Sequence, residues 1–366
     1  MSLPMIIIPF LVAAVVAAMM TPVVSRIAMA LDIVDRPNDR KVSDRTGMPL
    51  FGGGAVFAGV IAGLGAVAWT SQGHSYDQAK LFAFLFGGGL LLVIGLWDDR
   101  FALSAFQKLP FQIAAGLLAI ACGYEIDFFT NPFTLVPSEL PTYVVWPLTL
   151  LWIVAVTNAM NLIDGLDGLS AGLGVIIAAT LAVLCAQAGQ TTGLVLSAVL
   201  CGALLGYLPF NFPPARIFLG DAGALFIGYS LALLSIQGYR KAALLTFVVP
   251  LLALAVPLLD TLLSIQRRIR SGRGIFSADK MHMHHVLLQR EGSHRKAVLW
   301  LYFQTACFSI IAVSFSQLQG ISAWIFLAAV MMLTFRLLRN LGLLAVTTDE
   351  PRPEPPGSTD PHEESS

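Results

Sequence analysis

The chain has 366 residues, of which 56% are hydrophobic and only 12% are charged, and its mean hydropathy is +0.76. Soluble domains carry about 25% charged residues, so this composition excludes an ordinary water-soluble protein and favours a polytopic membrane protein. Lysine plus arginine equals aspartate plus glutamate, and the zero net charge gives no whole-chain reason to expect a nucleic-acid partner. The four cysteines lie apart in apolar runs, which argues against a zinc cluster or a disulfide framework.

Apolar runs of about 20 residues predict membrane-spanning helices, and glycine-rich stretches within them predict close helix packing. The first run has no basic segment before it, so we interpret it as a retained span and not as a signal peptide. We expect an all-α bundle of about eleven transmembrane helices within residues 1–340. The expected helices cover residues 3–31, 50–70, 80–97, 107–124, 143–160, 170–188, 192–210, 223–238, 242–265, 297–316 and 321–338.

Most basic residues fall in the loops that follow odd-numbered helices, and only Lys80, Arg240 and Lys241 lie on or beside the opposite side. The positive-inside rule then makes these loops cytoplasmic. It places the N-terminus outside and the C-terminus in the cytoplasm. Residues 341–366 are rich in proline, serine and acidic residues, which predicts a disordered tail.

Two adjacent acids, Asp98 and Asp99, directly follow the third expected helix, and Lys108 lies in the next one. Neighbouring carboxylates repel each other unless a cation lies beside them. A metal ion or a catalytic proton acceptor would therefore account for the pair. The alternative is a solvated helix end.

The segment NAMNLIDGLDGLSAG, residues 158–172, combines amides and acids at regular spacing. Asn158, Asn161 and Asp164 recur every three residues and share one broad helix face, and Asp167 follows them after a glycine. Such hard oxygen ligands without a basic residue suit Mg²⁺. The alternative is a polar loop with turn glycines.

Asp221 begins the eighth expected helix, between Gly220 and Gly223. It is either a helix cap or part of a helix start whose free N–H groups bind a phosphate. Both interpretations stay open.

Histidines 282, 284 and 285 lie in the most basic loop, and the first loop adds Arg40 and Lys41. The histidine spacing does not match a helical zinc site. We interpret the histidine-containing loop as an anion-binding lid, with lipid-headgroup contact as the alternative.

Asp260 lies inside the ninth expected helix, where an acid by default indicates a functional site.

Together these residues, gathered on one membrane face, are typical of Mg²⁺-dependent phosphoryl transfer between a lipid and a soluble anion. One alternative is a secondary transporter that uses Asp98, Asp164 and Asp260 for cation coupling, although transporter sites usually lie near the bilayer midplane. Another is a non-catalytic scaffold that binds a lipid carrier.

Six motifs, in order, resemble the polyprenyl-phosphate N-acetylhexosamine-1-phosphate transferases of the glycosyltransferase 4 type, over about residues 30–300. They are VDRPNDRK with MPLFGG, GLWDDRFALS, NAMNLIDGLDGL, RIFLGDAG, PLLD and DKMHMHH. The resemblance implies a multi-pass enzyme of the bacterial inner membrane with a cytoplasmic active site. It would transfer a sugar 1-phosphate from a UDP-N-acetylhexosamine to undecaprenyl phosphate, release UMP, and use Mg²⁺, with Mn²⁺ as a substitute.

DDRF and the His-x-His-His motif resemble the branch that uses UDP-N-acetylglucosamine and initiates O-antigen or other envelope polysaccharides. The alternative branch is the phospho-N-acetylmuramoyl-pentapeptide transferases. Ser43 and Ala224 stand where many relatives have histidine and serine, which leaves the exact sugar open. A homodimer is an assembly that the sequence also leaves open.

The resemblance also implies roles for individual residues. The implied catalytic residues are Asp98, Asp99, Asp164 and Asp167, and the implied metal ligands are Asp221 and Asp99. The implied substrate-binding residues are Asn158, Asn161, Lys108, His282, His284, His285, Arg40 and Lys41.

Overall fold

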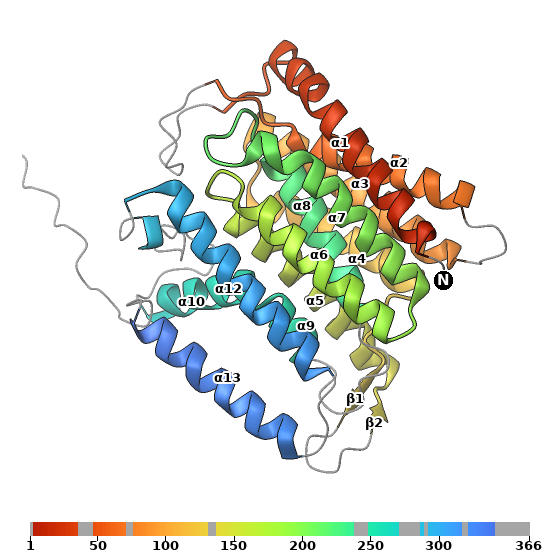
Figure 1. The fold of residues 1–366 in the computed structure, drawn as a ribbon, viewed down its shortest axis with the longest axis vertical. Helices are drawn as coiled ribbons and strands as arrows, with labels where there is room; N and C mark the ends of the chain where they lie inside the picture. The colour runs from red at the N-terminus through yellow and green to blue at the C-terminus, as the bar shows by residue number, and fades with distance from the viewer. Residues whose placement is uncertain are drawn as a thin grey trace, which may run out of the picture.

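Apolar segments form helices because a bilayer holds no water to satisfy backbone N–H and C=O groups. The computed structural model confirms an almost entirely helical chain (Figure 1). It describes residues 3–35, 47–70, 76–130, 137–237, 248–270, 286–288, 292–316 and 321–340, so the expected disordered tail lies outside the described residues.

The helices agree closely with the apolar runs. The first six are α1 (Pro4–Ala30), α2 (Gly52–Thr70), α3 (Gln78–Phe101), α4 (Ala105–Ala121), α5 (Thr142–Ile163) and α6 (Leu169–Gln187). The others are α7 (Thr191–Asn211), α8 (Gly220–Gln237), α9 (Val248–Ala253), α10 (Ala255–Arg270), α12 (His294–Phe315) and α13 (Ile321–Asn340).

Seven of the described helices, α1, α2, α3, α5, α6, α7 and α12, are long and apolar enough to cross a membrane. Helix α4 and the Trp324–Arg336 part of α13 are shorter apolar helices. Large apolar side chains such as Val15, Trp69 and Ile310 are more than half exposed, as expected of surfaces that face lipid. The chain is therefore a multi-pass membrane protein.

The prediction of one continuous ninth helix over residues 242–265 was wrong. Helix α9 ends at Ala253 and α10 begins at Ala255. Pro257 has no N–H to donate to the carbonyl of Ala253, and its ring crowds that carbonyl, which disfavours a straight helix at this point. Figure 1 shows α10 at an angle to the neighbouring α12.

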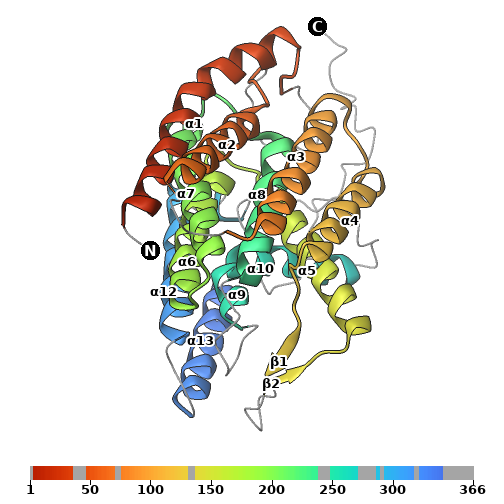
Figure 2. The same ribbon diagram turned by 90° about the vertical axis from the view of Figure 1, so that its right-hand side faces the viewer.

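Helix α8 lies at the centre of the bundle, between α7 on one side and α3 and α5 on the other (Figure 2). Every residue of α8 is buried except Asp221. Small residues bring the backbones together: a methyl group on Gly95 would lie 2.4 Å from the Ala222 backbone, and one on Gly53 would lie 2.3 Å from Gly223. The predicted close packing at glycines is thus confirmed. It fixes Asp221 at the mouth of the bundle, by which we mean the end where α8 begins.

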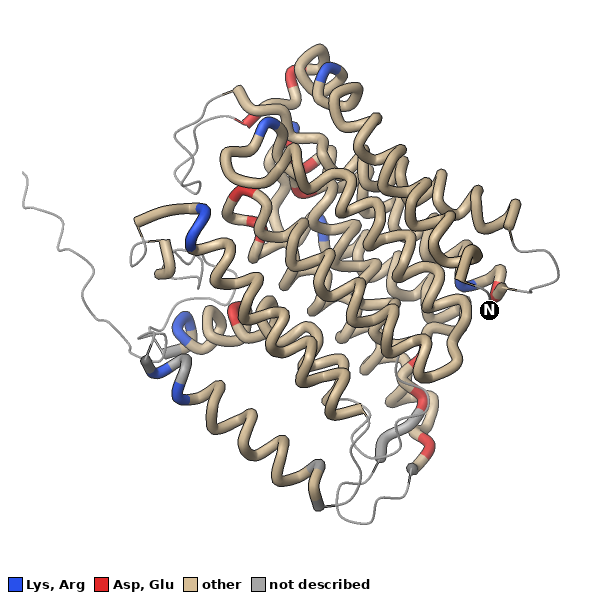
Figure 3. The backbone as a smooth tube through the Cα atoms, in the orientation of Figure 1, with Lys and Arg blue, Asp and Glu red and all other residues tan. Residues whose placement is uncertain are grey.

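The two ends of the bundle differ in charge (Figure 3). Described basic residues gather at the end where α3 and α5 finish and α8 begins. At the opposite end a small antiparallel hairpin, β1 (Phe128–Thr130) with β2 (Pro137–Glu139), connects α4 to α5 (Figure 2). These strands lie between the expected helices 107–124 and 143–160, where no element was predicted.

Candidate active site

A lysine between two carboxylates forms the centre of the candidate site. Lys108 Nζ lies 2.5 Å from Asp98 Oδ2 and 3.1 Å from Asp221 Oδ2. The Asp98 and Lys108 side chains are only 6% and 14% exposed, whereas the Asp221 side chain is 37% exposed. The cluster is thus buried on the α3 and α4 side and open at Asp221, where a ligand can reach it.

Local structure explains how Asp98 and Lys108 meet. Helix α3 ends at Phe101 and is followed by the C-cap residue Ala102, which has a positive φ of 51°, and Asp98 Oδ1 accepts the N–H of Leu103 at 2.6 Å. Helix α4 then begins with a capping box between Ser104 and Gln107. This tight reversal places Lys108, in the first turn of α4, beside the last turn of α3.

Asp99 has a different environment from Asp98. Its Oδ1 accepts the backbone N–H of Asp221 at 2.9 Å, and its Oδ2 accepts that of Ala222 at 3.2 Å. Asp99 therefore caps the start of α8 from a neighbouring helix. These two N–H groups are already engaged by protein, which argues against the interpretation that they bind a phosphate.

The two amides of the NAMN segment also differ. Asn158 exchanges hydrogen bonds with Gln112 of α4, at 2.6 and 3.3 Å. The side-chain amide of Asn161 interacts with the Asp221 carboxylate, but its buried Nδ2 makes no hydrogen bond of good geometry to the described residues. A buried donor without a partner is costly, so Asn161 is suited to bind an acceptor on a ligand.

Asp164 and Asp167 follow α5 in the turn that leads to α6. Asp164 is the C-terminal cap residue of α5, and Asp167 Oδ2 accepts the backbone N–H of Ala215 at 2.9 Å. Gly168, with φ of +74°, lets the chain turn into α6, and its carbonyl accepts the Tyr302 hydroxyl of α12. The segment thus connects α5 to the loop that precedes Asp221.

The structure brings together Asp98, Lys108, Asn161 and Asp221, from four helices, as the sequence analysis expected of one membrane face. Asp260 is fully buried in α10, a helix that packs against α5. Arg40, Lys41 and the three histidines lie outside the described residues.

Sequence reasoning missed two residues. Gln112 follows Lys108 by one helical turn and so shares its face of α4, a signal that could have identified it. Tyr302 had no comparable signal, because it reaches the site from a helix 134 residues further along the chain.

Within the described part of the chain, no cluster of three or more His, Cys, Asp or Glu side chains is arranged to hold a metal. Mg²⁺ is commonly bound by one or two carboxylates and completed by water and substrate phosphates. The partly exposed Asp221 with the neighbouring Asn161 fits that kind of site. It does not fit a preformed protein cage.

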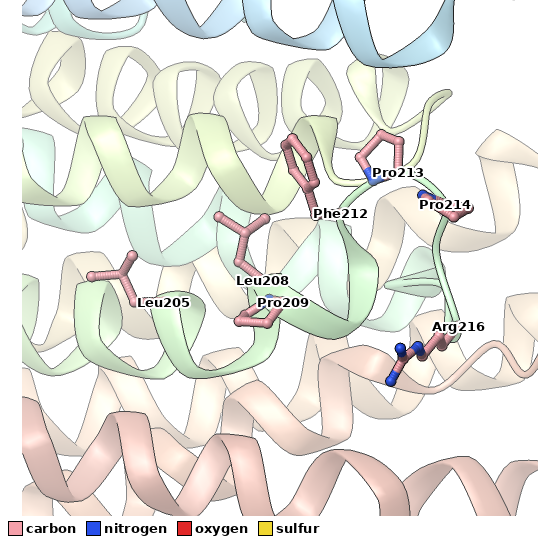
Figure 4. A pocket seen from close by; sticks show the side chains of 7 residues that line it. All are labelled: Leu205, Leu208, Pro209, Phe212, Pro213, Pro214 and Arg216. Atoms are coloured by element: carbon pink, nitrogen blue, oxygen red, sulfur yellow. The ribbon is translucent and has the colours of Figure 1, made fainter.

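A shallow pocket of about 480 Å³ lies beside the turn that follows α7 (Figure 4). Its lining is apolar apart from one arginine, and no carboxylate of the cluster contributes to it. The lining residues are Leu205, Leu208, Pro209, Phe212, Pro213, Pro214 and Arg216. The same turn carries the Ala215 N–H that Asp167 accepts, so the pocket adjoins backbone that Asp167 holds in place.

Comparison with known proteins identifies the family. Residues 81–239, which include the whole carboxylate cluster, match the family model described as Glycosyl transferase family 4. The chain is 40% identical to the probable undecaprenyl-phosphate N-acetylglucosaminyl 1-phosphate transferase of Bacillus subtilis, over 90% of this chain and 89% of that protein.

Two further relatives agree. The decaprenyl-phosphate N-acetylglucosaminephosphotransferase of Mycobacterium tuberculosis is 37% identical, over 80% of this chain and 78% of that protein. The undecaprenyl-phosphate alpha-N-acetylglucosaminyl 1-phosphate transferase of Yersinia pestis is 30% identical, over 84% of this chain and 83% of that protein. With a cluster of carboxylates at the mouth of a membrane bundle and relatives of this coverage, the chain belongs to the polyprenyl-phosphate N-acetylglucosamine-1-phosphate transferases of glycosyl transferase family 4.

Proposed function

We propose that the protein transfers N-acetylglucosamine 1-phosphate from UDP-N-acetylglucosamine to a polyprenyl phosphate, most simply undecaprenyl phosphate, and releases UMP. The observation that carries this proposal is the position of Lys108 between Asp98 and Asp221 at the mouth of the bundle. The names of the relatives differ in the polyprenyl chain and share the N-acetylglucosamine group. This agreement supports N-acetylglucosamine over the muramoyl-pentapeptide alternative.

The proposed location is the bacterial cytoplasmic membrane, with the carboxylate cluster on the cytoplasmic face. The support is the asymmetry of charge, because described basic residues gather at the end of the bundle that holds the cluster. Under the positive-inside rule this end is cytoplasmic. A soluble nucleotide sugar could then approach from the cytoplasm while the prenyl chain stays in the bilayer.

The proposed chemistry is a single displacement at the β-phosphorus of the nucleotide sugar. An oxygen of the lipid phosphate forms the new P–O bond, and the bond to the bridging oxygen breaks, so that UMP leaves with that oxygen. A phosphate monoester has a second pKa near 6, so the lipid phosphate is already largely a dianion at neutral pH. Removal of a proton then contributes little, and positioning and charge stabilisation contribute most.

Each group in the cluster has a task in this proposal. Lys108 attracts the phosphate oxygens, and Asp98 fixes the lysine from its buried side. An amide N–H of Asn161 donates to a diphosphate oxygen. Mg²⁺, or Mn²⁺ in its place, would be held by Asp221 and the substrate phosphates and would neutralise charge on the diphosphate.

One assay tests the proposed function. Purified protein is incubated with undecaprenyl phosphate, Mg²⁺ and a panel of UDP-sugars that includes the muramoyl-pentapeptide donor, and both UMP and lipid product are measured. We expect turnover with UDP-N-acetylglucosamine and at least about a 10²-fold loss in Asp221→Ala. A phosphorylated enzyme that reacts on addition of lipid would replace the single displacement with a two-step route. No UMP with any donor would refute the function.

A further inference from the structure

Two of the four aspartates expected to be catalytic contact backbone N–H groups of the segment that carries Asp221. Asp99 accepts those of Asp221 and Ala222, and Asp167 accepts that of Ala215. All three donors belong to residues 212–222, which connect α7 to the first turn of α8 and carry Asp221. The backbone N–H that Asp98 accepts belongs to Leu103, outside this segment, and Asp98 also contacts the Lys108 side chain that Asp221 contacts.

Other contacts hold the same segment from further elements. The Tyr207 hydroxyl and the Asn211 amide of α7 both donate to the carbonyl of Ile217, at 3.2 and 2.9 Å. The N–H groups of Gly52 and Gly53 at the start of α2 donate to the carbonyls of Phe218 and Leu219, at 3.0 and 2.9 Å. Residues 212–219 lie outside the named helices and strands, so such contacts determine where Asp221 lies.

Asp99 can cap α8 in this way only because residue 220 is a glycine. Gly220 has φ of +75°, and a methyl group on it would lie 2.5 Å from Asp99 Oδ2. The carboxylate therefore occupies the space that a side chain would need. Its negative charge lies at the positive end of the α8 dipole, an arrangement that stabilises the helix start.

We propose that Asp99 and Asp167 are positioning residues, which fix the backbone on both sides of the loop before α8 and so aim Asp221 at the ligand. In this assignment neither residue is a metal ligand or a proton acceptor. The inference rests on the proposed function for its kinetic test, and its structural test does not depend on that function.

The kinetic test compares alanine and asparagine variants at each aspartate. Asparagine retains a carbonyl oxygen that can accept one N–H, as Asp167 Oδ2 accepts that of Ala215. We expect Asp167→Ala to lower kcat about 30-fold with little change in KM. Asp167→Asn should recover at least about tenfold of that loss, because one charge-neutral hydrogen bond is kept. Asp99 accepts two N–H groups, so Asp99→Asn should recover less than Asp167→Asn.

Asp221→Asn and Asp98→Asn serve as the contrast. Both act through charge in our assignment, so asparagine should do no better than alanine there. If Asp167→Asn is as inactive as Asp167→Ala, the carboxylate charge itself is needed and the positioning role of Asp167 is refuted.

The structural test measures amide hydrogen exchange of the solubilised protein without substrate or metal. Peptides covering residues 212–222 should exchange about tenfold faster or more in Asp99→Ala and Asp167→Ala, because the capped N–H groups lose their acceptors. The same peptides should exchange as in the wild type in Asp77→Ala, because Asp77 caps the opposite end of α3, where it contacts Lys80. Unchanged exchange in both Asp99→Ala and Asp167→Ala would overturn the proposal. Exchange as expected in a protein without transferase activity would refute the proposed function and leave the positioning role intact.

Discussion

Helix α3 carries a lysine–aspartate pair near each of its ends, and the two pairs are built differently. At its start, Asp77 accepts the N–H of Lys80 at 3.2 Å and lies 3.5 Å from Lys80 Nζ. Near its other end, Asp98 contacts Lys108 of α4, and the same lysine contacts Asp221 of α8. The first pair closes within three residues of sequence, and the second joins three helices.

The difference indicates a structural role for the Asp77–Lys80 pair and a functional role for Asp98, Lys108 and Asp221. Asp77 is an N-cap, which satisfies the first turn of its own helix. Lys80 also lies over the Tyr124 ring, at 5.8 Å from its centroid, so both charges are accounted for by local packing. At the other end two carboxylates from distant segments meet at one cation. Such a costly arrangement in a membrane protein indicates a ligand site.

The largest expected effect comes from removing each lysine in turn. Lys108→Met leaves two neighbouring carboxylates without their shared cation, and we expect UMP release to fall at least about 100-fold. Lys80→Met removes a charge from the opposite end of the same helix and should leave UMP release within about threefold of wild type. Melting temperature in detergent checks that both variants fold. Full activity in Lys108→Met would remove the cluster from the active site.

Two glycines with left-handed backbone give the next largest contrast. Gly220→Ala and Gly47→Ala both introduce a side chain at positive φ, which costs about 1–2 kcal/mol. Only Gly220 has the Asp99 carboxylate in that space, whereas nothing lies within 4 Å of a methyl group on Gly47. We expect Gly220→Ala to lower kcat about tenfold, and Gly47→Ala to lower only the melting temperature. Equal kinetic losses would mean that backbone strain alone, and not displacement of Asp99, disturbs the site.

How much of the fold and of the candidate site could be predicted from the sequence depends on how far apart along the chain the contacting residues lie. Hydropathy predicted the helices well, and basic residues predicted that Asp98, Lys108 and Asp221 would share one end of the bundle. The cap that Asp99 provides for α8 could not be predicted, because its donors are 122 and 123 residues away. No local pattern distinguishes a carboxylate that accepts remote backbone N–H groups from one that binds a ligand.

The broken ninth helix is a different kind of failure. Pro257 stands within an apolar run that is long enough to predict a single span. In a membrane span a proline can be tolerated when neighbouring groups satisfy the freed backbone. Whether the helix kinks or breaks depends on those neighbours, which the sequence does not place.

A smaller effect is expected for the amide pair between α4 and α5. Gln112→Ala removes both hydrogen bonds to Asn158, and we expect KM for the nucleotide sugar to rise about fivefold as Asn158 loses its fixed orientation. The control is Trp152→Phe, on the same helix α5 as Asn158. It breaks the hydrogen bond from Trp152 Nε1 to Ser235 of α8 and should leave KM unchanged. In the double variant Gln112→Ala with Asn158→Ala, a coupling of about 1 kcal/mol is expected. Strict additivity would show that the two amides act independently.

The smallest effect is expected at the start of α3. Asp77→Ala removes the N-cap and should cost about 1 kcal/mol of stability, seen as a melting temperature a few degrees lower. Asp77→Asn should restore most of it, because asparagine caps helices about as well as aspartate. UMP release should stay near wild type in both variants, since the cap lies at the opposite end of α3 from Asp98. If Asp77→Ala reduced turnover as strongly as Lys108→Met, the two ends of α3 would be coupled, and a local cap would no longer account for Asp77.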